Sequence, residues 1–306
     1  MAADARIWRP RRVLVGYDGT EAARDAIALG RLLGERNADF LLVDVIPPAG
    51  FGLGPRRLED EEPPQSRGFF FEALRDLADR PVETRTYVAG SPAHVLTDIA
   101  AEEGFDLIAI GPCHPGIVGR ILLGSVGTGL MHGASAPVAA ATRGYDKHHR
   151  HAIRRIAVAW DGSPEAREAL LHAEALARRE AAALKLITVD VAPTTARGVI
   201  GWEPRVPRSP QQVLDDGVAV VAPDLEVEGA LVDGGSIAPA IAEECRVGVD
   251  LLVVGSRGYG ALGRVLVGSV ATGLLHRAKC PMLTVPRPRT AVGGRTFRGE
   301  EAVATG

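Results

Sequence analysis

The sequence predicts an α/β protein of two tandem domains, each with a parallel sheet covered by helices on both faces. One observation behind this fold class is an internal repeat. VLVGYDGTEAARDAIALG from Val13 matches IAVAWDGSPEAREALLHA from Ile156, and LLGSVGTGLMHGASAPV from Leu122 matches LVGSVATGLLHRAKCPM from Leu266. The other is that short apolar runs alternate with segments of helical period in each copy, which is typical of βαβ units.

The spacing of the repeat distinguishes two domains from a repeat array. Asp18 matches Asp161 at an offset of 143 residues, and Gly124 matches Gly268 at an offset of 144. A solenoid would show a period of about 20–50 residues, and a chain of 306 residues is long enough for two ordinary domains. We therefore expect one domain over residues 1–145, a polar link at 143–151, a second domain over 152–288, and a disordered tail over 289–306.

The first half divides into elements in chain order. A near-continuous apolar run at 12–17 suits a strand buried on both faces, and Thr20 can cap the helix that follows. Ser91 and Pro92 mark a later helix start, because serine caps helices and proline fits the first helical position. The predicted strands are 12–17, 40–46, 82–87, 107–110 and 137–141; the later helices are 70–79, 91–103 and 125–132; and residues 47–65 are a loop.

The second half repeats this plan. The pairs Ser163-Pro164 and Ser209-Pro210 are again helix starts. The predicted strands are 155–160, 184–191, 225–229, 251–254 and 282–285. Ligands of such sheets bind beyond the carboxyl ends of the strands, so we expect the site there.

Composition excludes several classes of protein. A net charge of −3 gives no electrostatic argument for binding nucleic acid or an anionic membrane. No apolar run approaches the roughly 20 residues of a membrane-spanning helix, and the first residues do not resemble a secretory signal. Cys113, Cys245 and Cys280 are scattered without CxxC spacing, which argues against a disulfide framework or a zinc site and predicts a cytoplasmic protein.

One glycine loop occurs twice, each time after a predicted strand. The second copy, GSRGYGALGRVLVGS, places Gly255, Gly258 and then Gly268-Ser269 in the frame G-x2-G-x9-G-S. The first copy keeps Gly111 and Gly124-Ser125, but His114 replaces the middle glycine. Glycines allow positive φ and close backbone approach, and a helix start exposes N–H groups that can face an anion. The loop therefore predicts a phosphate site.

The loop and the aspartate after the first strand together resemble the universal stress protein family in its tandem form, over nearly all of 13–141 and 156–285. The resemblance implies two flavodoxin-like (adenine nucleotide alpha hydrolase-like) domains, each with a five-stranded parallel sheet. It implies ATP, with or without Mg²⁺, as ligand, and domains that pair through their last strands. The implied site residues are Asp161, Val189, Gly255, Gly258, Gly268, Ser269 and Val270, with Asp18, Val45, Gly111, Gly124, Ser125 and Val126 in the first half.

Each of these residues also has an ordinary structural interpretation. Asp18 and Asp161 could make an Asx-turn before a helix, Ser269 could be a simple helix cap, and the two valines could be core. Arg120 and Arg264 could screen phosphate charge or lie in solvent. His114 could bind a phosphate or fill the place of a ligand.

The catalytic motifs of several ATP-using and hydrolytic enzymes are missing from the sequence. There is no GxxxxGK[ST] and no GxSxG, and the GxGxxG at Gly258–Gly263 follows the fourth strand rather than the first. We expect a nucleotide-binding regulator of a stress response with at most slow ATP hydrolysis. The alternatives are a scaffold without ligand and a slow ATPase, and whether whole chains form a homodimer is left open.

Overall fold

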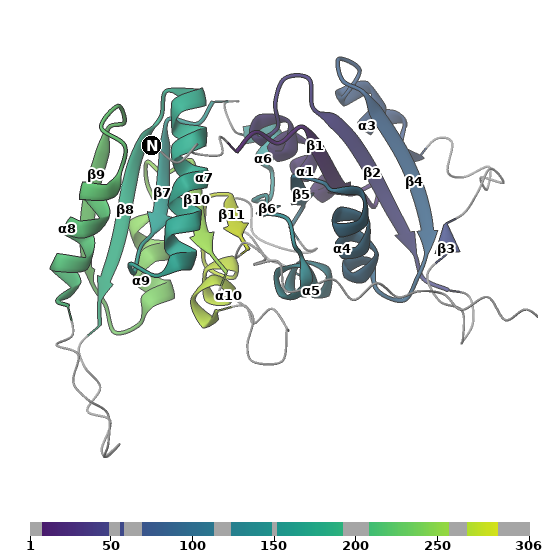
Figure 1. The fold of residues 1–306 in the computed structure, drawn as a ribbon. Coiled ribbons are helices and arrows are strands. Elements are labelled where there is room, and N and C mark those ends of the chain that lie inside the picture. Colours follow the sequence, from purple (N-terminus) through teal and green to yellow (C-terminus); the bar gives the residue numbers. More distant parts are fainter. Residues whose placement is uncertain are drawn as a thin grey trace, which may run out of the picture.

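The computed structural model describes residues 8–48, 56–57, 69–112, 124–148, 152–191, 208–256 and 268–286. Two blocks of alternating strands and helices, one in each half of the chain, meet in a continuous sheet (Figure 1). The first block contains β1 (Arg12–Gly16), α1 (Glu21–Leu33), β2 (Asp39–Ile46), β3 (Arg56–Arg57), α3 (Phe71–Asp76), β4 (Val82–Val88), α4 (Pro92–Glu103), β5 (Leu107–Ile110), α5 (Ser125–Gly133) and β6 (Val138–Ala140).

The second block follows the short helix α6 (Tyr145–His148) and repeats the order of the first. It contains β7 (Arg155–Ala159), α7 (Pro164–Glu180), β8 (Ala183–Asp190), α8 (Pro210–Val220), β9 (Val227–Asp233), α9 (Ile237–Glu244), β10 (Leu251–Gly255), α10 (Ser269–Leu275) and β11 (Met282–Val285). The predicted fold class, two α/β domains in tandem with mostly parallel strands, is confirmed.

The order of the strands refines the flavodoxin-like part of that expectation. The parallel strands of the two halves run β4-β2-β1-β5-β6 and β9-β8-β7-β10-β11. Counted along each half this is 3-2-1-4-5, the beginning of the Rossmann order, whereas flavodoxin has 2-1-3-4-5. The order reverses between β1 and β5, and between β7 and β10, so these pairs of strands bound the crevice where a ligand would bind.

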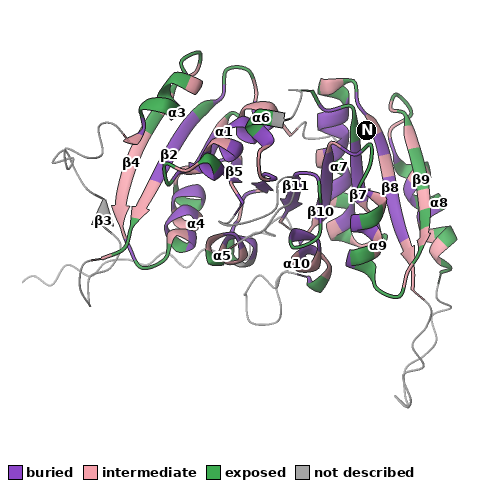
Figure 2. Cartoon of the chain, turned by 180° about the vertical axis from the view of Figure 1, so that it is seen from behind, coloured by how far each residue is buried: buried purple, intermediate pink, exposed green. Residues whose placement is uncertain are grey.

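Helices cover both faces of the sheet, and each face has its own core. Helices α1, α3, α7 and α8 pack on one face, and α4, α5, α9 and α10 pack on the other. Figure 2 shows the inner strands as buried and the outer strands β4 and β9 as partly exposed. Strands buried on both faces read as continuous apolar runs, which explains why β5 and β11 have the bounds that the sequence predicts.

Strands β6 and β11 join the two halves. They pair antiparallel, with Ala140 opposite Met282 and Val138 opposite Thr284, and they lie at the middle of the molecule (Figure 1). The predicted pairing of the two halves through their last strands is confirmed. The junction joins two parallel sheets into one, and the direction of the strands reverses between β6 and β11.

Side chains also tie the halves together on the face of α1 and α7. The guanidinium of Arg179 on α7 donates to the carbonyl oxygens of Leu33 and Leu32, each at 2.7 Å, at the carboxyl end of α1. The rings of Trp8 and His172 pack with centroids 5.0 Å apart, and burial lowers the pKa of His172. The first contact satisfies carbonyls that a helix end leaves unpaired.

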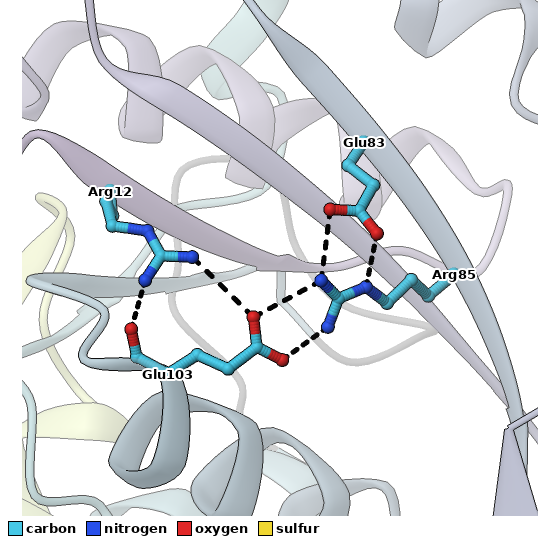
Figure 3. Close-up of polar contacts among 4 residues, drawn as sticks. All are labelled: Arg12, Glu83, Arg85 and Glu103. Carbon is cyan, nitrogen blue, oxygen red and sulfur yellow. Dashed lines mark hydrogen bonds and ion pairs between the residues drawn. The ribbon is translucent and has the colours of Figure 1, made fainter.

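The amino edge of the first sheet carries an ion-pair network rather than a site. Figure 3 shows Arg85 between Glu83 and Glu103, with Arg12 reaching Glu103. Hydrogen bonds to Glu83 and Glu103 raise the pKa of Arg85. The second half builds a similar cluster in which Lys185, on β8, contacts Glu244 at 2.6 Å and Glu228 at 3.4 Å.

Three predicted elements differ from the observed ones. The predicted loop at 47–65 contains β3, which pairs antiparallel with β4. The predicted polar link contains α6, because the carboxylate of Asp25 accepts hydrogen bonds from the backbone N–H groups of Gly144 and Asp146. The strand predicted at 225–229 runs instead over Val227–Asp233. Exposed residues interrupt this strand, so its sequence contains no continuous apolar run that would mark its ends. The predicted tail at 289–306 lies outside the described residues.

Candidate functional site

Both predicted aspartates lie in the turn that follows the first strand of their half. Asp18 Oδ1 accepts hydrogen bonds from the N–H and hydroxyl of Thr20 at 3.1 and 2.6 Å, and Asp161 Oδ1 accepts one from Ser163 N at 2.9 Å. The Asx-turn interpretation is therefore correct. The Oδ2 atom of each aspartate has no hydrogen-bond partner within the described part of the chain, so it remains available to another donor.

The glycines beside these aspartates supply the left-handed backbone of the turn. Gly19 has a φ of 73° and Gly162 a φ of 74°, a region that side chains with a Cβ rarely enter. The sequence signal for both was the Asp-Gly pair between a strand and a helix.

Gly111 and Gly255 are needed for packing, which corrects one expectation. Neither has a positive φ. A Cβ at Gly255 would lie 2.4 Å from the backbone oxygen of Glu165, and one at Gly111 would lie 1.9 Å from that of Ala22. The close backbone approach is made to the first turn of α7 or α1, so packing alone requires a glycine at both positions. The role expected of these glycines at a phosphate stays a prediction.

Gly124 and Gly268 occupy the cap positions of α5 and α10. Both have extended backbones and, having no side chain, leave the first turn without a side-chain cap. Ser125 and Ser269 are therefore the first residues inside their helices, and both are exposed. The alternative that Ser269 is a simple cap is wrong, because Gly268 holds that position.

A cavity of about 130 Å³ lies at the carboxyl ends of β7, β8 and β10. It brings together five residues predicted for the second half, which are Asp161, Val189, Gly255, Gly268 and Val270. Its remaining lining residues, which sequence reasoning missed, are Ala159, Trp160, Ser163, Glu165, Ala166, Ile187, Thr188, Ile237, Ile241, Val254 and Ala271. Most of them are apolar residues that a sequence pattern assigns to the core.

The aromatic residue before each aspartate is a shared structural part of the site. Trp160 is 3% exposed and its Nε1 donates to the carbonyl of Val213 at 2.8 Å. Tyr17 holds the same place in the first half, where its hydroxyl donates to the carbonyl of Phe69 at 3.3 Å. The signal that could have found them is the aromatic residue directly before the aspartate in both copies of the repeat.

The first half places its remaining site residues in corresponding positions. Val45 and Val126 are partly buried and pack against the same core as Val189 and Val270. Gly258, His114, Arg120 and Arg264 lie outside the described residues, so the roles expected for them stay predictions.

A larger cavity of about 1000 Å³ lies between α1 and α7. Its lining includes Arg31, Arg80 and Arg179. Arg80 and Arg179 donate to backbone carbonyls at the end of α1, and Arg31 donates to the carbonyl oxygen of Asp76, at the end of α3, and to Asp79. These arginines already satisfy a helix end, and the cavity is remote from the strand ends that bound the crevice.

Comparison with known proteins identifies the family. The model of the universal stress protein family matches residues 10–141 and again residues 152–286. The chain belongs to the universal stress protein family. A universal stress protein of Mycolicibacterium smegmatis is 28% identical over 299 residues, which cover 90% of this chain and 97% of that protein.

Further universal stress proteins match one half or the fold. One of Thermus aquaticus is 30% identical over 137 residues, covering 42% of this chain and 96% of its own length. The crystal structure of one from Archaeoglobus fulgidus aligns with a TM-score of 0.64 at 20% identity, over 91% of this chain and 99% of that chain. This structural likeness supports the shared fold alone.

In the described part of the chain, no helix combines the length and the apolar character needed to span a membrane.

Proposed function

We propose that the second half of this universal stress protein binds ATP, with or without Mg²⁺, and that the chain acts as a nucleotide-binding regulator of a stress response. The observation that carries the proposal is the meeting of Asp161, Val189, Gly255, Gly268 and Val270 around one cavity. These positions are more than 90 residues apart at their extremes and come from separate strands and loops.

The residues of the cavity suit the parts of a nucleotide. Val189, Ile237 and Val270 line the cavity, are at least partly exposed and offer an apolar surface to a base. The Oδ2 atom of Asp161, which has no hydrogen-bond partner among the described residues, can accept hydrogen bonds from ribose hydroxyls. Ligand pockets usually hold about 300–1,000 Å³, so a cavity of about 130 Å³ accommodates only part of ATP. The phosphates would then lie outside it, toward the loop that ends at Gly268.

The start of α10 suits a phosphate. Gly268 leaves the first N–H groups of the helix without a side-chain cap, and such groups attract anions. Bound ATP would supply negative charge to this helix end, and the exposed hydroxyl of Ser269 could donate to a phosphate oxygen.

The sequence favours binding over turnover. It contains no GxxxxGK[ST] motif and therefore no P-loop lysine to act on a phosphoryl group. The protein would therefore hold the nucleotide and signal its presence, with hydrolysis slow at most.

Calorimetric titration of ATP into the wild type and into Gly268→Val tests this assignment. Valine can adopt the backbone of Gly268, which has φ −61° and ψ 142°, but its side chain would narrow the approach to the helix end. We expect affinity to fall at least about tenfold, which corresponds to 1.4 kcal/mol. The matched control is Gly124→Val, at the equivalent cap of the first half, and it should leave the second-half affinity unchanged.

Equal heats for the wild type and Gly268→Val would contradict the assigned site. A complete lack of heat in the wild type would favour the scaffold alternative, while steady phosphate release above background would favour the ATPase.

A further inference from the structure

The two halves differ at one position of the strand that borders the site. Val43 of β2 pairs with Gly16 and Ile187 of β8 pairs with Ala159, and the backbone N–H of the next residue, Tyr17 or Trp160, donates to Val43 O or Ile187 O at 2.9 Å. The residue after Val43 is Asp44, and the residue after Ile187 is Thr188. The register therefore makes Asp44 and Thr188 equivalent.

Thr188 is neutral and satisfied. It is 5% exposed, it lines the cavity, and its hydroxyl donates to the carbonyl oxygen of Trp160 at 3.0 Å. It adds no charge to the second site.

Asp44 brings a carboxyl group to the equivalent place in the first half. Burial raises the pKa of Asp44, a hydrogen bond from the N–H of Val45 opposes that rise, and the charge of Asp18 adds to it. Thr188, the equivalent of Asp44 in the register, lines the second cavity, so Asp44 lies at the corresponding strand end of the first half, next to the turn that holds Asp18.

The second cavity has a carboxylate of its own in Glu165, on the first turn of α7, where the first half has Ala22. Glu165 has an interaction partner, and it lies on a helix rather than on the strand. A carboxylate at this strand position is therefore particular to the first half.

A second, independent difference between the halves also makes the surroundings of the first site more negative than those of the second. Arg24 and Arg167 are equivalent in the repeat. Arg24 forms an ion pair with Glu72 at 3.0 Å. Burial above all, and then the charges of Glu72, Asp76 and Asp18, raise the pKa of Tyr17, while the charge of Arg24 lowers it. Arg167 lies 5.9 Å from the ring centroid of Trp160 and forms no ion pair within the described residues, so its positive charge is not neutralised there.

We propose that Asp44 is the specificity-determining residue that makes the first half reject an anionic nucleotide that the second half accepts. The proposal rests on the proposed function of the second site. A carboxylate near a polyphosphate repels it, and this repulsion is stronger in a partly buried place than in water. We expect the first half to bind ATP at least about tenfold more weakly than the second.

Photolabelling with 8-azido-ATP, followed by mapping of the labelled peptides, reads the two halves separately in one full-length chain. In the wild type the second half should take up about ten times more label than the first at subsaturating probe. Asp44→Asn keeps the shape of the side chain and removes its charge, so first-half labelling should rise at least about threefold.

The reciprocal pair of variants tests the same charge in the second half. Thr188→Asp should reduce second-half labelling about tenfold relative to Thr188→Asn, which has a side chain of the same size without the charge. The comparison of these two variants isolates the effect of the charge from any effect of losing the threonine. Circular dichroism checks that Thr188→Asp is folded. If that variant does not fold, the inference is decided by Asp44→Asn, which removes a partly desolvated charge and is therefore expected to fold.

The outcomes separate this inference from the proposed function. Equal labelling of the two wild-type halves, or unchanged first-half labelling in Asp44→Asn, would overturn the inference and leave ATP binding standing. Equal losses in Thr188→Asp and Thr188→Asn would show a packing effect and also overturn it. No specific label in either half would overturn both.

Discussion

At the scale of single residues, Gly111 and Gly255 show how a small residue can be required by a neighbour far along the chain. Each lies where a central strand ends against the first turn of the helix that follows the first strand of its half. The missing Cβ lets two backbones approach closely. This contact holds the end of the strand against the helix, so in the second half it helps to position the candidate site that Gly255 lines.

Gly255→Ala should destabilise the protein by about 2–3 kcal/mol, because the added Cβ would lie 2.4 Å from a backbone oxygen that cannot rotate away. The matched control is Gly235→Ala, where a Cβ meets nothing within 4 Å, and it should change stability by less than about 0.5 kcal/mol. Urea unfolding at equilibrium measures both. Similar midpoints for the two variants would contradict the packing role of Gly255.

At the scale of elements, the helices of the second half begin in two different ways. Ser209 and Gln212 form a capping box at the start of α8, in which each side chain bonds the other residue's backbone N–H, at 3.2 and 3.0 Å. Ser236 is also a serine at the cap position of its helix, α9, but its side chain makes no cap hydrogen bond. A serine at a helix start is thus stabilising only where its hydroxyl reaches the first turn.

Ser209→Ala should cost about 1 kcal/mol of stability, because it leaves an N–H group of the first turn of α8 without its partner. Ser236→Ala removes the same atoms from a cap that makes no such bond and should cost less than about 0.5 kcal/mol. Thermal and urea unfolding compare the two. If Ser236→Ala proved the more harmful, the observed cap geometry would be wrong.

At the scale of the whole molecule, the short pairing of β6 with β11 is reinforced by contacts between α1 and α7. Arg179 reaches from the second half to two carbonyls of the first. Arg178, its neighbour, makes its ion pair with Asp224 inside the second half, at 2.8 Å. Variants of these two adjacent arginines can therefore distinguish contacts that join the halves from contacts that stabilise one half.

Arg179→Met should lower the free energy of unfolding by about 1–3 kcal/mol, because the carbonyls of Leu32 and Leu33 lose charged donors. Arg178→Met breaks the exposed ion pair with Asp224 and a longer one, at 3.7 Å, with Glu174, and should cost less, about 1 kcal/mol at most. Urea unfolding followed by tryptophan fluorescence suits the measurement, since Trp8 packs across the junction against His172. Equal losses would argue against a joining role for Arg179.

Much of the fold could be predicted from the sequence, because inner strands such as Leu107–Ile110 are apolar throughout and helix starts carry serine and proline. The predicted position of strand β9 was wrong by several residues, because exposed residues interrupt this strand and it therefore forms no continuous apolar run. At the candidate site, repetition and spacing predicted Asp161 and Gly268, which line one cavity, but Trp160 and Thr188 resemble core residues until the strands are aligned. The significance of Asp44 depends on register, which no local pattern contains.

The packing of Gly255 means that a glycine at this position is required by the fold as well as suited to a ligand. Half of a familiar binding signature can persist in a descendant that has lost its ligand, because folding alone retains the glycine that ends the strand. Gly255 on its own is therefore weak evidence of a ligand, in this chain or in its relatives. The titration that compares Gly268→Val with the wild type is the stronger evidence of whether the second half binds a nucleotide.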